Sequence, residues 1–554
     1  MEEKNSNLSF CSIPLQIRVG VTGKRDINLT DELKSSIQTA LTEEVHKIIN
    51  PKSKQLKTPL SYKIITPLAE GADRIVAIEA MEVLNAEMEV ILPMIKEEYK
   101  ETFLNDESRV EFEQLLLKAS SVESLIKKPL LEQFPGKELP ECRHIAYENL
   151  GDELISKSDI LIALWDGIIN NKPGGTGAVV SEARTKNKTI IIISSASPHK
   201  IKIERGEDFI KRSFVNIELL NSFEINPVEK KKYIENINKG FSAGAASSID
   251  PANLKIVNDN LHPYYIRSSK IAKHFQAHYK NTGLAVYILS PLAVATIALG
   301  IIFHKESTIF FLTEFLLLMG VLLLILLADR RKVNKKWIQN RYLTEQLRCA
   351  TFFILCGFKP RRIKIPSHLR VAHRPDDWMI KVYDKILERT SNIPVYPEER
   401  FPDLLEYIKV HWLQDQIIYH QNKTKDTKRK SKRLEFSGWF VFGLAVIAAA
   451  SHLLIVHYGF EFRYEWIADF ITFIAVTLPA VGAALGAVRT HGEYSRIEKR
   501  CENMAVALNE LLQDSEEITS MKGLEKWMDK IEDTMLHETQ DWLMLMKFVK
   551  LEAI

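Results

Sequence analysis

Cysteine is scarce in this chain, and its spacing argues against two common classes of small domain. The 554 residues include five cysteines, with no CxxC pair and no histidine at metal-ligand spacing. A disulfide-stapled secreted fold and a zinc module are both disfavoured, and we expect reduced thiols in a cytosolic environment. Residues 1–12 are polar, so we expect no secretory signal there.

A strong net charge is missing as well. Lysine and arginine number 74 against 71 aspartates and glutamates, which leaves a net charge of +3. So small an excess argues against nucleic acid as the main partner, because such proteins neutralise many phosphates. The basic residues instead gather beside long apolar stretches, which makes membrane lipid the expected partner.

The second half of the chain is rich in long stretches with little or no charge. Each is about twenty residues long, enough to cross a hydrocarbon core of ~30 Å as a helix. They are 284–303, 309–328, 437–456 and 466–487. Short polar turns join the first stretch to the second and the third to the fourth, so the sequence predicts two membrane hairpins.

The lysine and arginine pattern predicts how these spans are oriented. Basic residues crowd the chain before and after each hairpin, whereas the two turns carry only Lys305 and Arg463. Because basic loops stay on the cytoplasmic side, we expect a multi-pass protein of the cell inner membrane. Both termini and every large segment are then cytoplasmic.

Residues 13–195 alternate short apolar runs with helical patterns, as in an α/β fold with a parallel sheet. The expected strands are 16–21, 62–66, 89–92, 160–165 and 189–194. Their unbroken Ile, Val and Leu content predicts a Rossmann-like parallel sheet with helices on both faces. The predicted fold class is thus α/β plus α-helical membrane, with four transmembrane helices in two hairpins that have cytosolic helical extensions.

The loops after these strands are rich in glycine and polar residues. In parallel sheets ligands bind beyond the carboxyl ends of the strands, where small residues admit a ligand and helix N-termini attract phosphate. Lys24, Arg25 and Arg74 add positive charge there. The sequence therefore predicts a site for a phosphorylated, nucleotide-like ligand. Its candidate residues are Gly23, Lys24, Arg25, Glu70, Gly71, Asp73, Arg74, Trp165, Asp166, Gly174, Gly175 and Thr176.

Four motifs in order, VGVTGKRD, TPLAEGADR, SDILIALWDG and KPGGTGAVVSEA, resemble the SLOG superfamily over about residues 14–200. This group of Rossmann-like domains includes the LOG enzymes and the DNA-processing protein DprA. The resemblance implies a site for nucleotides or nucleotide-derived messengers. It assigns phosphate binding to Gly23, Lys24 and Arg25, the ribose side to Glu70, Gly71, Asp73 and Arg74, and a second phosphate to Gly174, Gly175 and Thr176.

One departure from this family concerns catalysis. The hydrolytic LOG members resemble PGGxGTxxE, but here Ser181 stands where that glutamate belongs and Glu182 comes one residue later. One step turns a helical side chain by about 100°, which misdirects the carboxylate that an N-glycosidic hydrolase needs. We therefore expect a sensor rather than an enzyme. The alternative is a membrane-tethered nucleotide hydrolase.

Some loop residues have a second, structural interpretation. Asp73 and Arg74 could be a surface ion pair, and Asp166 could form an Asx turn or a helix cap. Trp165 suits the core as well as it suits a platform for base stacking.

The membrane half looks like an approximate internal duplication. Each half has a hairpin, a basic helix entry and an amphipathic helix, and Arg330 and Arg489 follow the two second spans. This layout resembles the SLATT family, two-span membrane modules linked to nucleotide sensors in bacterial conflict systems. The expected divisions are 1–200 (nucleotide binding), 201–280 (helical connector with a flexible stretch at 240–248), 281–360 (first hairpin and helix), 361–436 (cytosolic helices) and 437–554 (second hairpin and C-terminal helices).

Charged residues inside membrane spans suggest a function by default. Glu314 and Asp469 lie near the outer ends of the second and fourth spans. In an oligomer they would ring a pore mouth and favour cations; otherwise they lie at the water interface without selectivity. His452 either gates the third span or packs against a neighbour.

Two further features of the spans concern their shape. Pro291 and Pro479 are expected to kink or break their helices. The small residues of 482–487 favour close contact between helices, and assembly into a homo-oligomer is expected.

Together these features predict a ligand-gated membrane effector. Its cytosolic domain would bind a nucleotide-derived second messenger, such as a cyclic nucleotide or an ADP-ribose-type molecule, and drive an oligomeric pore or ion channel. The resemblance implies permeabilised or depolarised membranes in anti-phage defence. No cofactor, metal or nucleic acid is expected. A transporter with a regulatory domain is a third possibility, which four spans per chain disfavour.

Overall fold

The computed structural model describes residues 12–49, 57–168, 174–206, 209–228, 231–232, 235, 249–302, 308–363, 378–390, 392–458 and 465–546. The chain divides into two units. The described residues up to 222, together with 378–382, form the sheet unit, and the described residues of 223–363 and 383–546 form the helical unit. Part of the stretch 361–436 therefore belongs to the sheet unit.

A few predicted features lie outside the described residues. They are the flexible stretch 240–248, the two hairpin turns with Lys305 and Arg463, and Lys172 and Pro173 of the glycine-rich motif.

The sheet unit contains a seven-stranded sheet with the strand order β4-β3-β2-β1-β5-β6-β7. Only the pairing of β6 with β7 is antiparallel. The strands are β1 (Leu15–Gly23), β2 (Leu60–Thr66), β3 (Glu87–Leu92), β4 (Ser121–Ser124), β5 (Ile160–Trp165), β6 (Thr189–Ser194) and β7 (Ile201–Glu204). The predicted α/β class is confirmed.

The five expected strands correspond to β1, β2, β3, β5 and β6. Every residue of β5 is buried, and burying one Ile or Leu side chain contributes about 1.5–3 kcal/mol. Sequence reasoning missed the two edge strands. β4 reads SVES and is mostly exposed, and β7 reads IKIE over only four residues, so neither has the apolar run of a central strand.

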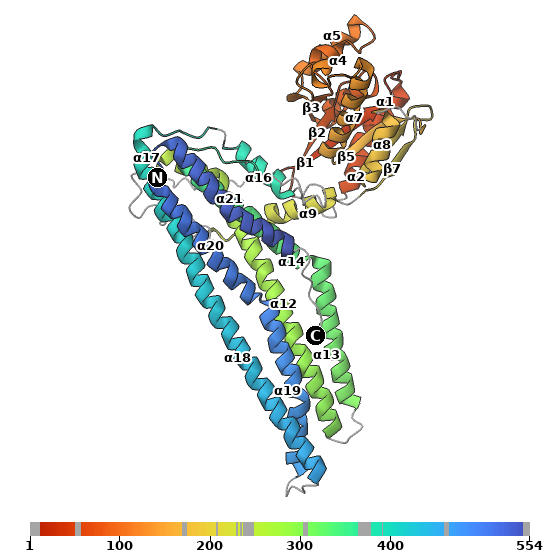
Figure 1. The fold of residues 1–554 in the computed structure, drawn as a ribbon. Helices are drawn as coiled ribbons and strands as arrows, with labels where there is room; N and C mark the ends of the chain where they lie inside the picture. Colours follow the sequence, from red (N-terminus) through yellow and green to blue (C-terminus); the bar gives the residue numbers. More distant parts are fainter. Residues whose placement is uncertain are drawn as a thin grey trace, which may run out of the picture. The chain divides into compact units, whose positions relative to one another are not determined.

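Helices connect the strands and cover the sheet (Figure 1). Those that bear on the site are α3 (Ala72–Leu84), α4 (Lys96–Lys100), α5 (Asp106–Leu117), α7 (Leu139–Lys157) and α8 (Thr176–Thr185). α3 packs on β1 and β2, and α7 and α8 pack together. Leu150, Leu154, Val179 and Val180 of these two helices share a buried cluster with β5 and β6.

The chain changes direction in the sheet at β1. From β1 it builds outward through β2, β3 and β4, and then returns to place β5 on the other side of β1. β1 and β5 run parallel, with Gly23 opposite Leu164 at their ends. In open α/β sheets the crevice beyond such a reversal point is where ligands bind.

Among the described residues, four helices are long and apolar enough to cross a membrane, and all four belong to the helical unit. They are α12 (His262–Ile302), α13 (Thr308–Arg331), α18 (Asp415–Tyr458) and α19 (Glu465–His491). α12 packs on α13, α18 packs on α19, and α12 also contacts α19 (Figure 1). The chain is thus membrane-embedded, as the four apolar stretches predicted.

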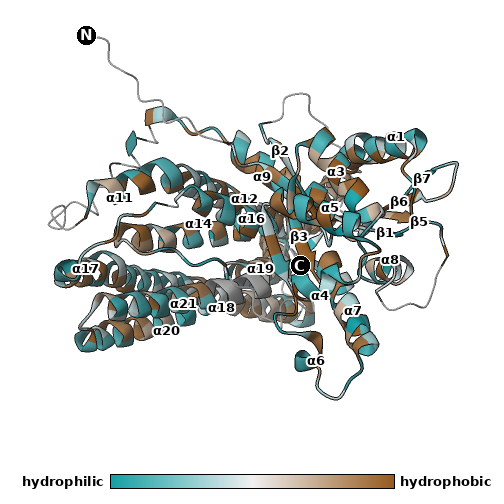
Figure 2. Cartoon of the chain, turned by 90° about the horizontal axis from the view of Figure 1, so that it is seen from above, coloured by the Kyte–Doolittle hydropathy of each residue, from teal (hydrophilic) through white to brown (hydrophobic). Residues whose placement is uncertain are grey.

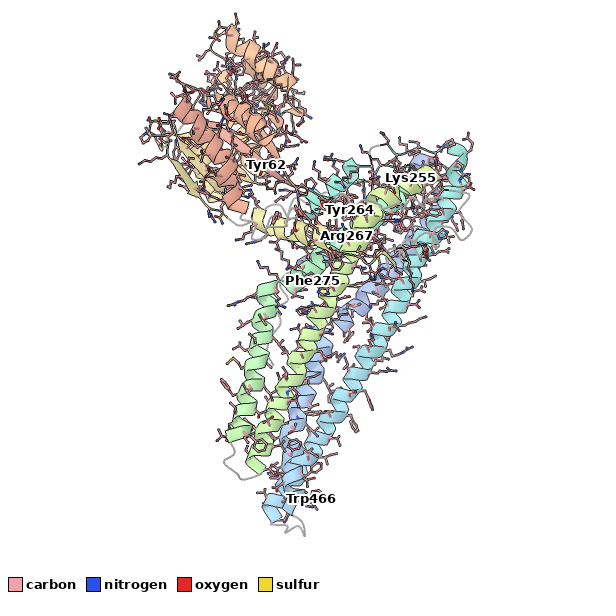
Figure 3. All side chains as sticks on the ribbon, turned by 180° about the vertical axis from the view of Figure 1, so that it is seen from behind. Tyr62, Lys255, Tyr264, Arg267, Phe275 and Trp466 are labelled. Atoms are coloured by element: carbon pink, nitrogen blue, oxygen red, sulfur yellow. The ribbon has the colours of Figure 1, made fainter. Side chains whose placement is uncertain are left out.

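The surface of these helices is apolar, as a membrane requires. Of the 18 most apolar consecutive residues of α13, only 6% are buried within the structure. Large aromatic residues are exposed at both ends of the second hairpin: Trp439 lies near the start of the apolar stretch of α18, and Tyr458 and Trp466 lie near the turn. Aromatic side chains favour such positions at the two membrane interfaces. Figure 3 shows Trp466 at the end of the bundle far from Tyr264 and Phe275.

The helical unit repeats one order of elements twice. A short helix, α11 (Pro251–Ile256) or α17 (Phe401–Ile408), runs through a π-helical turn into the long α12 or α18. After each hairpin comes a helix, α14 (Val333–Leu355) or α20 (Tyr494–Asp514), that packs on α12 or α18 respectively. This order supports the predicted internal duplication. α20 and the last helix, α21 (Met521–Met546), mix hydrophilic and hydrophobic residues along their length (Figure 2).

Two predictions about the shape of the spans have clear outcomes. Neither Pro291 nor Pro479 breaks its helix, since α12 and α19 continue through them. The small residues of α19 do allow close packing: Ala484 shares a buried cluster with Val286 of α12 and Val321 of α13.

Candidate functional site

The predicted ligand residues lie at the carboxyl edge of the sheet, in the loops after the strands or in the ends of the strands and helices that flank these loops. The loop after β1 holds Lys24 and Arg25, and the loop after β2 leads through Glu70 and Gly71 into α3. The loop after β5 begins at Asp166. The parallel sheet therefore brings these three motifs to one edge, at the point where its strand order reverses.

Gly71 lets the loops after β1 and β2 touch. Its φ is +76°, and a Cβ atom there would lie 2.2 Å from the Arg25 carbonyl oxygen and 2.7 Å from that of Lys24. The Ala72 amide donates to the Lys24 carbonyl at 3.0 Å. The main chain of the first loop is thus fixed against the start of α3, and the Lys24 and Arg25 side chains project from a held backbone.

Lys24 forms an ion pair with Asp166 across the reversal point of the sheet. The hydrogen bond from Lys24 lowers the pKa of Asp166. The other carboxylate oxygen of Asp166 accepts from the Ile168 amide at 3.1 Å, which is an Asx turn. Asp166 therefore forms the Asx turn that was the alternative to a ligand contact. It also positions the Lys24 side chain.

Arg25 is exposed and has no carboxylate partner among the described residues. Its guanidinium donates to the Tyr147 hydroxyl at 3.0 Å and to the Thr102 carbonyl at 3.3 Å. Tyr147 lies on α7. Arg25 is thus oriented by neutral groups, and its positive charge stays available to an anion.

Gly174, Gly175 and Thr176 form the start of α8. Gly174 has φ +70°, and a Cβ atom there would lie 2.5 Å from the Tyr147 Cβ. Gly175 is the N-cap residue and makes no side-chain cap, and the first helical bond runs from the Val179 amide to the Gly175 carbonyl. Tyr147 contacts both Arg25 and Gly174, so it draws the first loop and the α8 N-terminus together. Amides at such an end favour phosphate.

Three buried polar atoms near Arg25 have no hydrogen-bond partner among the described residues. They belong to Asp73 (Oδ1), Tyr99 (hydroxyl) and Arg74 (Nη2). The groups interact electrostatically with one another and with Arg25. Buried polar atoms without a partner are uncommon in folded proteins, so this cluster suits a polar ligand.

The same burial shifts the ionisation of two of these groups. Desolvation raises the pKa of Asp73 to about 8, against the opposing effect of Arg25 and of a hydrogen bond from the Ala69 amide. Desolvation also raises the pKa of Tyr99 well above its usual value. Both groups are hydrogen-bond donors at neutral pH as a result.

Glu70 and Arg74 mainly hold the site together. Glu70 accepts from the Leu104 amide at 2.9 Å and from the Ser108 hydroxyl at 2.6 Å. Arg74 is 3% exposed and donates to the Leu68 and Ser108 carbonyls, each at 3.1 Å. Its Nη1 also pairs with Glu111 at 2.6 Å. Only Nη2 of Arg74 is left for a ligand, and Arg74 is not a surface residue.

Trp165 takes the core interpretation. It is 5% exposed, belongs to the buried cluster under the site, and donates from Nε1 to the Ile168 carbonyl at 3.0 Å. The Arg184 guanidinium lies over its ring, 5.6 Å from the centroid. Its ring therefore supports the loop after β5 from below.

Two residues of this site were not among the predicted ones. Tyr147 is on a helix far along the chain, and Tyr99 comes after the third strand. Tyr99 carried a weak signal, because it lies on α4, a few residues after the parallel strand β3. Tyr147 carried none, because its role depends on how α7 packs.

Glu182, the displaced LOG-type carboxylate, lies on α8 and pairs with Lys186 at 3.2 Å, one turn along the same helix. The preceding Ser181 is exposed. The side chain of Glu182 is thus engaged on the surface of α8.

The three polar residues predicted to matter in the spans lie on three different helices. Glu314 and Asp469 are both half-buried, on α13 and α19. His452 hydrogen-bonds through Nδ1 with the Thr472 hydroxyl at 3.0 Å, which links α18 to α19. His452 therefore packs against a neighbouring helix, which was one of its two predicted roles.

Within the described residues, no group of three or more His, Cys, Asp or Glu side chains could hold a metal ion. Cys142, Cys349, Cys356 and Cys501 are buried and form no disulfide in the described ranges. No protein-family model matches the chain, and no curated protein matches it.

Proposed function

We propose that the chain is a ligand-gated membrane effector with a SLOG-like sensor and SLATT-like membrane modules. The sheet unit binds a nucleotide-derived messenger, and binding drives an oligomer of the helical unit to permeabilise or depolarise the membrane. One observation carries this proposal. Lys24 and Arg25 lie at the reversal point of a parallel sheet, and Arg25 lies near buried polar atoms that have no hydrogen-bond partner within the described ranges.

The chemistry of this edge favours an anion with a polar, hydrogen-bonding body. Lys24 and Arg25 supply positive charge, and the start of α8 supplies backbone amides. Asp73 and Tyr99, both protonated at neutral pH, suit the hydroxyl and carbonyl oxygens of a sugar or base. A phosphorylated nucleoside derivative has both parts.

The helical unit supplies the means to act on a membrane. Its four apolar helices expose most of their surface, and each chain offers two hairpins. Glu314 and Asp469 would line the mouth of an assembled pore and favour cations.

Gating needs a messenger that prefers the active state. A tenfold preference supplies about 1.4 kcal/mol per site, so several coupled subunits would give a sharper response. This is the reason for proposing a homo-oligomer.

The test measures messenger binding and membrane leakage on the same full-length protein. We expect heat on titration with one member of a panel of cyclic nucleotides and ADP-ribose derivatives, and leakage of ion-loaded liposomes with that member only. The double variant K24Q/R25Q should lose both. K127Q/K128Q removes two charges from exposed positions of the same unit and should lose neither.

Three outcomes would count against the proposal. If K24Q/R25Q and K127Q/K128Q leak equally, Lys24 and Arg25 do not bind the messenger that opens the membrane. If no member of the panel gives heat with folded protein, the sheet unit does not bind such a messenger. Binding without leakage would leave a sensor but reject the channel.

One observation favours a second function, hydrolysis of a nucleotide N-glycosidic bond. The pKa of Asp73, about 8, suits a general acid near neutral pH. Release of free base from nucleoside monophosphates, abolished in Asp73→Asn, would support this function.

A further inference from the structure

The end of α19 joins α12 and α18 where both enter their apolar stretches. His491 packs against Tyr279 of α12, with ring centroids 4.5 Å apart and the ring planes tilted by 35°. Arg489 contacts α18, where its Nε donates to the Ser431 hydroxyl at 3.2 Å and its guanidinium pairs with Glu435 at 3.1 Å. The last turn of α19 therefore fixes this part of α12 beside this part of α18.

Three lysines lie around this junction, and all three are exposed. Lys280 follows Tyr279 on α12, and Lys430 precedes Ser431 on α18. Lys423 lies on the same face of α18 as Lys430, because seven residues are almost two full turns of a helix. The positive charges of Lys423 and Lys430 both act on Lys280.

These lysines are not paired with carboxylates in the described part of the chain. Among the described residues, none of the three makes an ion pair, although Lys428 of the same helix pairs with Glu498 at 3.7 Å. Like charges that converge from two helices repel one another. An anion placed among them would remove that repulsion.

The position of the cluster identifies the anion. Lys280 lies four residues before the apolar stretch 284–303, about 6 Å along the helix, which is the depth of lipid phosphates at a membrane surface. Below it on α12, Leu284 and Ile288 are exposed, as are Phe436 and Trp439 on α18. Figure 3 shows Phe275 on α12, just before this region. Apolar side chains next to a cationic cluster suit a molecule with acyl chains and an anionic head.

We propose that Lys280, Lys423 and Lys430 bind the phosphate of an anionic phospholipid headgroup, in a site formed by α12 and α18. These are the first spans of the two repeats. A lipid bound there ties the two hairpins together, so the packing of the helical unit depends on the anionic lipid content of the membrane.

The test uses the full-length protein in detergent and native mass spectrometry to count bound lipids. The probes are phosphatidylglycerol and phosphatidylcholine, with inorganic phosphate as the soluble anion. We expect at least about tenfold tighter binding of phosphatidylglycerol than of phosphatidylcholine, since each nearby cation contributes to attraction. K280Q/K423Q/K430Q should lose this preference, and K280R/K423R/K430R should keep it.

A matched control removes three charges from the other side of α18. Lys425, Arg429 and Lys432 are exposed and lie about 180–240° around the helix from Lys423. K425Q/R429Q/K432Q should keep the preference for phosphatidylglycerol.

An equal loss of the preference for phosphatidylglycerol in K280Q/K423Q/K430Q and K425Q/R429Q/K432Q would overturn the proposal. It would mean that the lipid is attracted by the basic stretch as a whole and not by a specific site. Displacement of the lipid by an equal concentration of inorganic phosphate would show a soluble-anion site instead. If K280Q/K423Q/K430Q does not fold, Lys423→Gln alone takes its place. Unchanged preference in that exposed single variant would also reject the proposal.

Discussion

At the scale of single residues, the site depends on close contacts that tolerate no added atom. Gly71 is the clearest case, because two carbonyl oxygens lie where its Cβ would be. Asp73 is a second case, because its carboxyl group is buried and one of its oxygens has no hydrogen-bond partner in the part of the chain that the structure describes. Each of these two residues leads to a prediction about the stability of the sheet unit.

Gly71→Ala should abolish messenger binding and destabilise the sheet unit. The methyl group would meet the Arg25 and Lys24 carbonyls at a φ of +76°, so the first loop must move. Gly136→Ala is the control, since its φ is +84° and nothing lies near its Cβ. It should cost only the backbone strain, about 1–2 kcal/mol. Thermal unfolding and calorimetry of both variants provide the comparison, and equal effects would contradict this account.

Asp73→Asn should stabilise the sheet unit more at pH 8 than at pH 5. The pKa of Asp73 is raised to about 8 in the folded state, so the folded protein binds a proton that the unfolded chain releases above about pH 4. The unfolding free energy of the wild type therefore falls as pH rises through this window, at up to about 1.4 kcal/mol per unit from this group. Hydrogen exchange of β1–β3 amides at both pH values measures the slope, which should be smaller in the variant.

At the scale of elements, the repeat in the helical unit includes its turns. Each second span is followed closely by a residue in the left-handed conformation, Lys332 with φ +48° and Glu493 with φ +49°. Each of these residues precedes the first residue of the next helix, α14 or α20. Both hairpins are therefore joined to the helix that follows them by the same backbone device, although the residues differ.

Lys332→Gly and Glu493→Gly should each raise the melting temperature of the full-length protein in detergent. Glycine removes the cost of a left-handed L-residue, about 1 kcal/mol. Lys499→Gly, at an exposed position inside α20, is the control and should lower stability by a similar amount. Destabilisation by both turn variants would mean that their side chains matter more than their backbone.

At the scale of the whole molecule, the chain returns to its first domain after the first hairpin. Lys381 pairs with Asp159, 222 positions away, with Nζ 3.0 Å from each carboxylate oxygen. Arg18 of β1 holds the same carboxylate at 3.1 Å. Desolvation alone would raise the pKa of Asp159, but Lys381 and Arg18 outweigh it and hold the pKa well below its usual value. The sheet unit is therefore completed by a segment from the middle of the chain.

Lys381→Met should destabilise the sheet unit by roughly 1–3 kcal/mol at neutral pH, because Asp159 keeps only Arg18 as a cationic partner. A lowered carboxyl pKa stabilises the fold above the unfolded pKa, and this contribution is lost as pH falls. The variant should also lose less stability on acidification from pH 7 to pH 3 than the wild type does. Hydrogen exchange of β1 and β5 amides tests both points, with Lys385→Met, which removes a surface pair with Glu388, as the control.

The amino-acid sequence by itself determined the two classes of structure in this chain. Unbroken runs of Ile and Val are enough for buried parallel strands, and runs of about twenty apolar residues are enough for membrane spans. It also located Lys24, Arg25 and Gly71, because loops after parallel strands meet at one edge whatever the details of packing.

Only the tertiary structure decided what each side chain does at that edge. Arg74 and Trp165 have the residue types of ligand contacts, yet burial makes them supports of the site. Tyr147 and Lys381 could not be predicted, because each acts on residues more than a hundred positions away. Local patterns determine which elements form, whereas the charge, burial and partners of a side chain depend on neighbours that only folding brings together.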